Sequence, residues 1–399
     1  MKTKSLVLVS ALSLMTAQSA FGSGFEKSIP WGGETSGLAG IGSPYMQNSQ
    51  ALFFNPAGLA GDKVGQDVSF NISPTFATFK APITDSTKQE TSKSNPVFPL
   101  SLIYGHTLND KIGYGFGFYT AGGMANDYEV SKTGVNTVYH NKVKLAINEL
   151  ALGAGYKVMD NLKVGATYRI GMVNGEFYQA GDAGLGGLFE GKYTDLSGSN
   201  YFGLKLGAQY KLSDDTHLSF VYRSEMTYKA KGKYTLATSA GGPIADGVDV
   251  KVGTLLPAAW TLGAHHKLND TWNLYGEYVF TEYSKVTNLS TEGGTSSPVE
   301  LKWKDQHNVR LAAAYSGFAL PVRVGYVWTS QVTHKDHALP SLIPPGPANT
   351  FTLGTGHSFG SFKVDGGFEY TMVSGQATGA TVDNEVSEYA LHLGASYSF

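Results

Sequence analysis

Charged side chains recur at every second position in several segments of this chain, alternating with large apolar residues. Successive side chains of a strand point to opposite faces, so each charged set would share one face. The cations are Lys163, Arg169, Lys205, Arg223, Arg310 and Arg323, and the acids are Glu225, Glu277, Asp365 and Glu369. An arginine on that face could hold a ligand carboxylate through two parallel hydrogen bonds, and we take Arg169, Arg223 and Arg310 as candidates. Mutual ion pairing is the alternative, and the spacing does not decide between them.

Other kinds of chemistry find little support in the sequence. His265 and His266 would face opposite ways in a strand, so this pair cannot chelate one ion. His334 and His337 lie in a polar stretch without a clear third ligand, and cysteine is absent, so we predict no metal site. No nucleophile elbow or serine–histidine–acid signature occurs. We therefore predict that the chain is not an enzyme and uses no cofactor.

The elements that must position these side chains are strands joined by alternating short and long connections. The short turns are Asn109–Lys111, Asp160–Asn161, Ser213–Asp215, Asn269–Thr271, Ser316–Gly317 and Gly360–Ser361. The long polar loops fall at 80–98, 122–141, 178–200, 233–256, 285–303, 331–349 and 374–387. Short turns at one end and long loops at the other are typical of outer-membrane barrels.

The last segment shows the strand pattern most clearly. Tyr389, Leu391, Leu393, Ala395, Tyr397 and Phe399 alternate with small or polar residues. About fourteen such segments occur between 67 and 399, an even number, as single-chain bacterial barrels have. The fold class is therefore all-β, a transmembrane antiparallel barrel, and a face switch near Asn148–Glu149 indicates a bulge. No repeat of 20–50 residues supports a propeller or solenoid.

Composition agrees with a membrane barrel and excludes some partners. Gly (50), Tyr (23) and Phe (21) are abundant, while charged residues make up 16%. Lipid-facing strands and aromatic girdles require such a composition. The net charge of −2 provides no basic field for nucleic acid.

Residues 1–22 have the pattern of a cleavable secretory signal. Lys2 and Lys4 precede an apolar stretch from Leu6 to Met15, and Ala20-Phe21-Gly22 is a small-x-small cleavage site. No later stretch approaches the ~20 apolar residues of a membrane helix. Export together with strands that face lipid places the chain in the bacterial outer membrane.

The region from 23 to 66 does not alternate and precedes the first strand. It contains small residues and two apolar clusters, Leu38/Ile41 and Leu52–Phe54. A barrel of about fourteen strands is too wide to be filled by its own side chains. We interpret this region as a plug, or hatch, inside the barrel.

Several motifs resemble the FadL family of outer-membrane transporters for hydrophobic compounds. They are Ser23-Gly24-Phe25, Ser36-Gly37-Leu38-Ala39, Asn55-Pro56-Ala57-Gly58-Leu59, Tyr222-Arg223-Ser224-Glu225, Lys231-Gly232-Lys233-Tyr234, Leu256-Pro257 with Trp260, Lys304-Asp305 and the terminal Phe399. The similarity covers essentially the whole mature chain. It implies a fourteen-stranded barrel with an N-terminal hatch that takes up long-chain fatty acids or, in some branches, aromatic hydrocarbons.

The resemblance also implies a path for the ligand. Capture would occur in an apolar groove among outer loops, here Leu185, Leu188, Phe189, Leu255 and Leu256. The third loop, 178–200, is shorter than in the family, which departs from the pattern. Exit would be lateral, through a kinked third strand that ends in Gly122-Gly123, with the hatch at Asn55-Pro56-Ala57 as the gate.

Two further expectations concern partners and alternatives. Phe399 would be the assembly signal for the barrel-insertion machinery, and outer-membrane lipid would surround the barrel. A general polar porin is the alternative function, and the plug opposes it because a porin requires a water-filled channel. An outer-membrane lipid hydrolase would require a catalytic set that the sequence lacks.

Overall fold

The computed structural model describes residues 32–83, 85–93, 96–131, 137–184, 187–239, 241–293, 299–339 and 342–399. The strands are β1 (Gly65–Ile72), β2 (Thr75–Ala81), β3 (Glu90–Thr91), β4 (Leu100–Thr107), β5 (Ile112–Val130), β6 (Tyr139–Met159), β7 (Leu162–Gly184), β8 (Gly187–Lys211), β9 (Thr216–Arg223), β10 (Met226–Thr238), β11 (Gly241–Leu256), β12 (Ala259–Lys267), β13 (Trp272–Thr281), β14 (Asn288–Glu292), β15 (Val299–Glu300), β16 (Gln306–Tyr315), β17 (Val322–Thr329), β18 (Ala348–Phe359), β19 (Phe362–Gly375) and β20 (Asn384–Ser398). The helical turns are α2 (Gly33–Ser36), α3 (Ala51–Phe54), η1 (Pro56–Leu59), η2 (Tyr283–Lys285) and η3 (Lys335–His337).

These elements form a closed 14-strand antiparallel barrel, as the sequence predicts. Several barrel strands consist of two consecutive elements, for example β9 followed by β10. The barrel closes because β1 pairs with β4 on one side and with β20 on the other. Closure leaves no edge whose backbone groups would lie unpaired in hydrocarbon.

The outer surface is apolar around the barrel. Strand residues of one parity are exposed and large, among them Leu102, Phe116, Leu152, Leu206, Phe220, Leu262, Leu311, Phe351 and Leu391. Their neighbours of the other parity are buried and mostly polar or small, as in Thr350 and Thr352 on β18. Among the described residues, no helix has the length and apolar character needed to cross a membrane.

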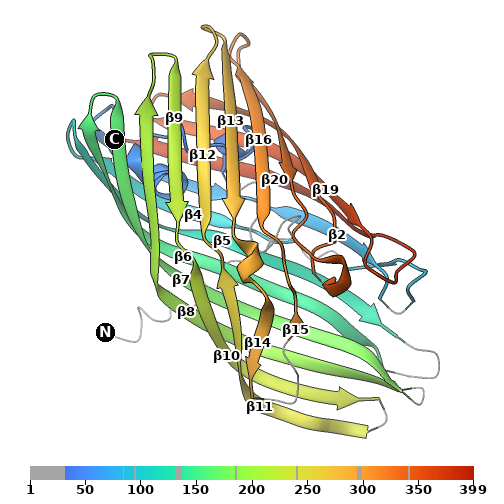
Figure 1. Cartoon of the computed structure of the whole chain (residues 1–399). Coiled ribbons are helices and arrows are strands. Elements are labelled where there is room, and N and C mark those ends of the chain that lie inside the picture. Colours follow the sequence, from blue (N-terminus) through green and yellow to red (C-terminus); the bar gives the residue numbers. More distant parts are fainter. Residues whose placement is uncertain are drawn as a thin grey trace.

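The wall has two heights. Strands β5–β8 have 19–25 residues, whereas β16 and β17 have 10 and 8. In Figure 1 the taller strands, with β10 and β11, extend past the others at the end opposite the short turns. The prediction of polar loops at 122–141, 178–200 and 233–256 was therefore wrong for most of these residues. Their polar side chains lie on strands that continue beyond the apolar band, where water solvates the outer face.

The third barrel strand, β5, contains a bulge. Thr120 pairs with Asn148 and Gly122 with Ile147, so Ala121 is the extra residue. The bulge predicted near Asn148–Glu149 therefore lies opposite, on β5, and next to Gly122-Gly123. Gly123 has φ 154°, and a Cβ there would lie 2.3 Å from the Leu145 carbonyl oxygen. The position requires glycine on both counts.

The N-terminal segment (residues 32–64) packs against the inner wall of the barrel. Leu38, Leu52 and Asn55 are buried. Glycines of the wall make room for it: a Cβ at Gly165 would lie 2.3 Å from the Pro56 carbonyl carbon. A Cβ at Gly207 would lie 2.0 Å from the Asn55 side-chain oxygen. The wall and the segment therefore fit each other closely.

Candidate functional site

Asn55 fixes the N-terminal segment to the wall. Its Nδ2 donates to the Ser43 carbonyl at 3.1 Å and to the Ala208 carbonyl of β8 at 3.0 Å. Its Oδ1 accepts the backbone N–H of Ala57 at 3.1 Å, which caps η1, and Pro56 is the first residue of that turn. The sequence interpretation assigned Asn55 to a gate for exit through the third strand, but these hydrogen bonds go to β8 and to the segment itself.

A second anchor is electrostatic. Lys363 of β19 donates to Glu34 of α2 at 2.5 Å and lies 3.3 Å from Asp365. Asp365 also pairs with Arg323 of β17 at 2.8 Å. Burial raises the pKa of the Glu34 carboxyl, but the cations Lys363 and Arg323 together lower it by more than burial raises it. The pKa of Glu34 therefore lies below its usual value. Glu34 is therefore a partly buried anion compensated by two cations.

An inner cavity of about 130 Å³ lies between the N-terminal segment and the bulge of β5. Phe53 and Phe54 line it from α3, and Thr120, Ala121 and Gly122 line it from β5. Its charged lining consists of Glu149, Lys205, Arg223, Glu277 and Arg310. The cavity therefore combines aromatic rings and three cations with a lining that includes the bulge of β5.

Each cation of the inner cavity has partners in the protein. Arg310 pairs with Glu277 at 2.7 Å, and Arg223 donates to the Pro257 carbonyl at 2.9 Å. Lys205 donates to the Phe53 carbonyl, and its Nζ lies 4.6 Å from the centre of the Phe53 ring. Two of the predicted arginines, Arg223 and Arg310, thus lie together at this cavity.

The third predicted arginine, Arg169, is fully buried and paired with Glu149. Its Nε and Nη2 donate to the two carboxylate oxygens at 2.9 and 2.6 Å. Tyr119 donates to the same carboxylate at 2.8 Å, and Nη2 also contacts the Met226 sulfur at 3.2 Å. Of the predicted acids, Glu225 is exposed and pairs with Lys285, so it does not line the lumen.

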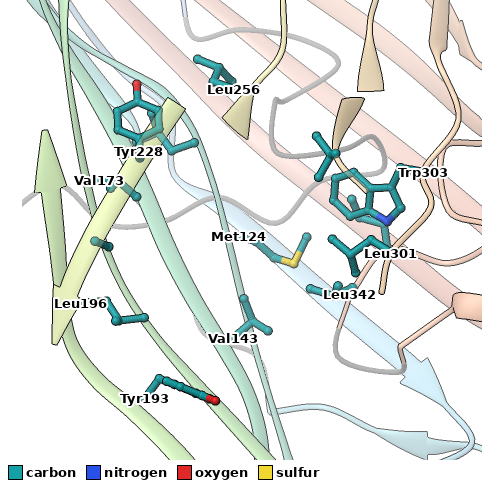
Figure 2. Close-up of a cluster of buried hydrophobic side chains, with 14 of the residues drawn as sticks. Met124, Val143, Val173, Tyr193, Leu196, Tyr228, Leu256, Leu301, Trp303 and Leu342 are labelled. Atoms are coloured by element: carbon teal, nitrogen blue, oxygen red, sulfur yellow. The ribbon is translucent and has the colours of Figure 1, made fainter. Parts of the chain in front are cut away.

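An outer cavity of about 90 Å³ lies among the tall strands. Its lining is mainly apolar: Val143, Leu145, Val173, Phe177, Tyr193, Leu196, Ala230, Val252 and Leu342, with Lys144 and Glu176 among the few polar residues. Figure 2 shows Val173, Tyr193 and Leu196 on the tall strands and Trp303, Leu301 and Leu342 across the interior from them. The walls thus form an apolar chamber next to the largest buried cluster.

The predicted groove residues do not form one group. Leu256 belongs to the large cluster around the outer cavity, with Leu255 packed against it. Leu188 belongs to a separate cluster with Val130 and Tyr139. Phe189 follows it on β8, and Leu185 lies outside the described residues.

The sequence interpretation did not select the residues that line the outer cavity. Apolar residues alternate with other residues in these segments, for example at Val143, Leu145, Val173 and Phe177. Other cavity residues lie in the segments 178–200 and 233–256, which were assigned to loops. Continuing the period of two past residue 178 would have found Tyr193. His334 and His337 lie with ring centres 5.6 Å apart, and no group of three His, Cys, Asp or Glu residues in the described chain could hold a metal.

A family model for an outer membrane protein transport protein (OMPP1/FadL/TodX) matches residues 13–398. The chain belongs to this family. Family membership agrees with the predicted outer-membrane location and with the prediction of a transport protein rather than an enzyme.

Curated relatives of this FadL/TodX-family chain match over part of their length. The 47 kDa outer membrane protein of Pasteurella multocida is 27% identical over 44% of this chain and 45% of the relative. Outer membrane protein P1 of Haemophilus influenzae is 22% identical over 68% and 65%. The long-chain fatty acid transport protein of Escherichia coli O157:H7 is 27% identical over 31% of each chain. The chain thus spans less than two thirds of these relatives.

Solved structures share the fold of the FadL/TodX-family chain. A FadL homologue of Pseudomonas aeruginosa superposes with a TM-score of 0.78 at 18% identity, covering 94% of this chain and 99% of the other. The toluene transporter TodX of P. putida gives 0.74 at 18% identity, covering 93% and 99%. At these identities the likeness concerns the fold alone.

Proposed function

We propose that the chain carries hydrophobic small molecules across the outer membrane, with long-chain fatty acids as the main substrate class. The observation that carries the proposal is the pairing of an apolar outer cavity with an inner cavity that contains cations and aromatic rings. A long acyl chain gains about 0.8 kcal/mol for each methylene that leaves water. The outer cavity would take the chain, and Lys205, Arg223 or Arg310 would take a carboxylate.

Aromatic hydrocarbons are the second candidate substrate. The lining of the outer cavity is almost entirely apolar and includes Phe177 and Tyr193, and a benzene-sized molecule would need no cation. Competition between oleate and toluene for the purified protein separates the two candidates. Displacement of a bound fluorescent fatty acid by oleate alone supports the first candidate.

We further propose lateral release at β5. The ladder between β4 and β5 ends at the pair Ser101–Tyr119, within the described residues. Beyond it, β5 continues along β6, and Ala121 and Gly122 line the inner cavity. Release at this point would keep an acyl chain out of water if the wall opened here, because hydrocarbon surrounds the barrel.

A substitution at the bulge tests the release route. Gly123→Ala places a Cβ 2.3 Å from the Leu145 carbonyl, so the bulge must shift. We expect fatty-acid uptake to fall severalfold while the heat-modifiable folded fraction persists. The control is Gly379→Ala, which has φ 84° but open space around it. Equal uptake by both variants would remove lateral release from the mechanism.

The N-terminal segment would act as the gate at Asn55-Pro56-Ala57. Asn55→Ala together with Pro56→Gly removes the bond to β8 and the rigid start of η1. We expect reduced uptake with normal barrel assembly. Deleting residues 26–60 should raise single-channel conductance in planar bilayers, and unchanged conductance would favour an open porin.

A further inference from the structure

Two rows of side chains cross the inner wall near the short turns. The register places Ser219, Gly263 and Glu277 in one row and His217, His265 and Tyr275 in the next. All six belong to one face of β9, β12 and β13. His266 belongs to the other face, where it bonds to Thr216 at 2.9 Å. The histidine beside His265 on the lumen side is therefore His217, from the neighbouring strand.

The N-terminal segment docks on the first row. The Ser43 hydroxyl donates to Glu277 at 2.5 Å and lies 2.8 Å from the Ser219 hydroxyl. A Cβ at Gly263 would lie 2.6 Å from the Ser43 hydroxyl and 3.1 Å from the Pro44 ring. Only a glycine at position 263 allows this approach without a shift. The contact places Tyr45, which follows Pro44, at the second row.

In the second row the rings stack. His217 and His265 have ring centres 5.7 Å apart and planes within 16°. The Tyr45 ring lies 6.0 Å from His265 and 5.3 Å from Tyr275. Two imidazoles from the wall and one phenol from the N-terminal segment thus share one site.

The hydrogen bonding of His265 leaves one ring nitrogen available. Its Nε2 lies 3.0 Å from the Asn273 side-chain oxygen, which only accepts, so Nε2 carries the proton. In the neutral ring Nδ1 then holds a lone pair. Metal-binding histidines are commonly oriented in this way, with the second nitrogen donating to a nearby oxygen.

Three polar atoms of this site are buried without a hydrogen-bond partner among the described residues: His217 Nδ1, His265 Nδ1 and the Tyr45 hydroxyl. A buried polar atom without a partner is destabilising. His265 Nδ1 carries a lone pair, and His217 Nδ1 and the Tyr45 hydroxyl belong to side chains whose rings lie beside it. A cation held between these side chains would give all three atoms a partner.

We propose that His217 and His265 bind a divalent transition-metal ion such as Zn²⁺, with Tyr45 as a third ligand directly or through a water. Imidazole nitrogens favour Zn²⁺, Cu²⁺ and Ni²⁺ over Mg²⁺ and Ca²⁺, which prefer oxygen. Bound metal would join the N-terminal segment to the wall at β9 and β12. Metal binding does not depend on the proposed transport, although it would hold the gate in its docked position.

The test uses tag-free, full-length protein that has been stripped with EDTA and kept in detergent. Titration calorimetry with Zn²⁺ should give one site with micromolar affinity, and Mg²⁺ should give none. His217→Ala and His265→Ala should each lower the affinity at least about tenfold. His266→Ala is the matched control, since it removes a neighbouring imidazole from the opposite face, and its affinity should be unchanged.

Protection from proteolysis tests whether bound metal joins the N-terminal segment to the barrel wall. Zn²⁺ should slow cleavage within residues 32–64 of the wild type but not of the His217→Ala/His265→Ala variant. Tyr45→Phe should keep binding within a few fold and lose most of this protection. No Zn²⁺ binding at 100 µM, or an equal loss of affinity in His266→Ala, would overturn the proposal. Since no transport is measured, failure here leaves the proposed function untouched.

Discussion

The outer and inner cavities differ in what they offer a ligand, although both lie inside one barrel. The outer cavity lies among the tall strands and is lined by side chains such as Val173, Tyr193 and Leu196. The inner cavity is lined by Lys205 and Arg310 and, from the N-terminal segment, by Phe53 and Phe54. Glu149, which also lines the inner cavity, forms a buried ion pair with Arg169. Under the proposed function, the two cavities would hold different ends of an amphipathic ligand.

The difference between the two cavities is tested most directly by placing a charge in the outer cavity. Val173→Asp buries a carboxylate among apolar side chains, where desolvation costs several kcal/mol. We expect the affinity for a fluorescent fatty acid to fall about hundredfold, by equilibrium titration. Thr261→Asp, in the inner cavity beside Arg223 and Arg310, is the control and should lose far less. Equal losses would show that the two cavities do not differ in this respect.

A smaller effect should separate ligands by their head groups. Lys205→Met keeps the length of the side chain in the inner cavity but removes its charge. We expect the affinity for oleate to fall about tenfold, since a hydrogen bond to a charged group contributes about 1.5–3 kcal/mol. The affinity for an alkane of equal length should stay the same. A parallel loss for both ligands would assign Lys205 a structural role.

The smallest effect on ligand affinity should come from the buried pair of Arg169 and Glu149, whose charges already compensate each other. Arg169→Met alone leaves Glu149 buried and uncompensated, which should lower the free energy of unfolding by about 3–5 kcal/mol. Arg169→Met with Glu149→Gln should recover most of that loss in urea unfolding, with oleate affinity within about twofold of the wild type. A large loss of affinity in the double variant would make Arg169 a ligand.

A fourth prediction concerns assembly, and it remains a prediction from the sequence. Phe399 follows the last residue of β20 and is exposed, and its backbone bonds to Gln66 at the start of β1. Deleting Phe399 should lower the heat-modifiable folded fraction in outer membranes. Ser398→Ala is a control at the same strand end, and normal assembly of the deletion would argue against a terminal signal.

The sequence predicts the barrel well because alternation is a local property. The strand at 387–399 and the turn at Asn269–Thr271 required no knowledge of other segments. The bulge was located from β6, although its extra residue, Ala121, belongs to β5. Only the pairing of two strands defines a bulge, so one strand could not show which of them carries it.

The candidate site was less predictable because it depends on contacts between distant segments. The alternation of side chains along the strands predicted that Arg169 and Arg310 lie on the inner face. It could not predict which carboxylate each arginine would pair with. The cavity residues Tyr193 and Leu196 of β8 and Val252 of β11 were missed because 178–200 and 233–256 were interpreted as loops. Polar residues also occur on strands that extend beyond the lipid. His217 and His265 became neighbours only through the register of β9 and β12.

The electrostatic anchor of the N-terminal segment constrains the order in which the protein can fold. Glu34 meets Lys363 across 329 residues of sequence. The Glu34 carboxylate therefore lacks this partner until β19, one of the last strands, has been made and inserted. Contacts so distant in sequence form slowly, because the chain between them must be ordered first. We expect α2 to be among the last elements to reach its native position, after the ring of strands has closed.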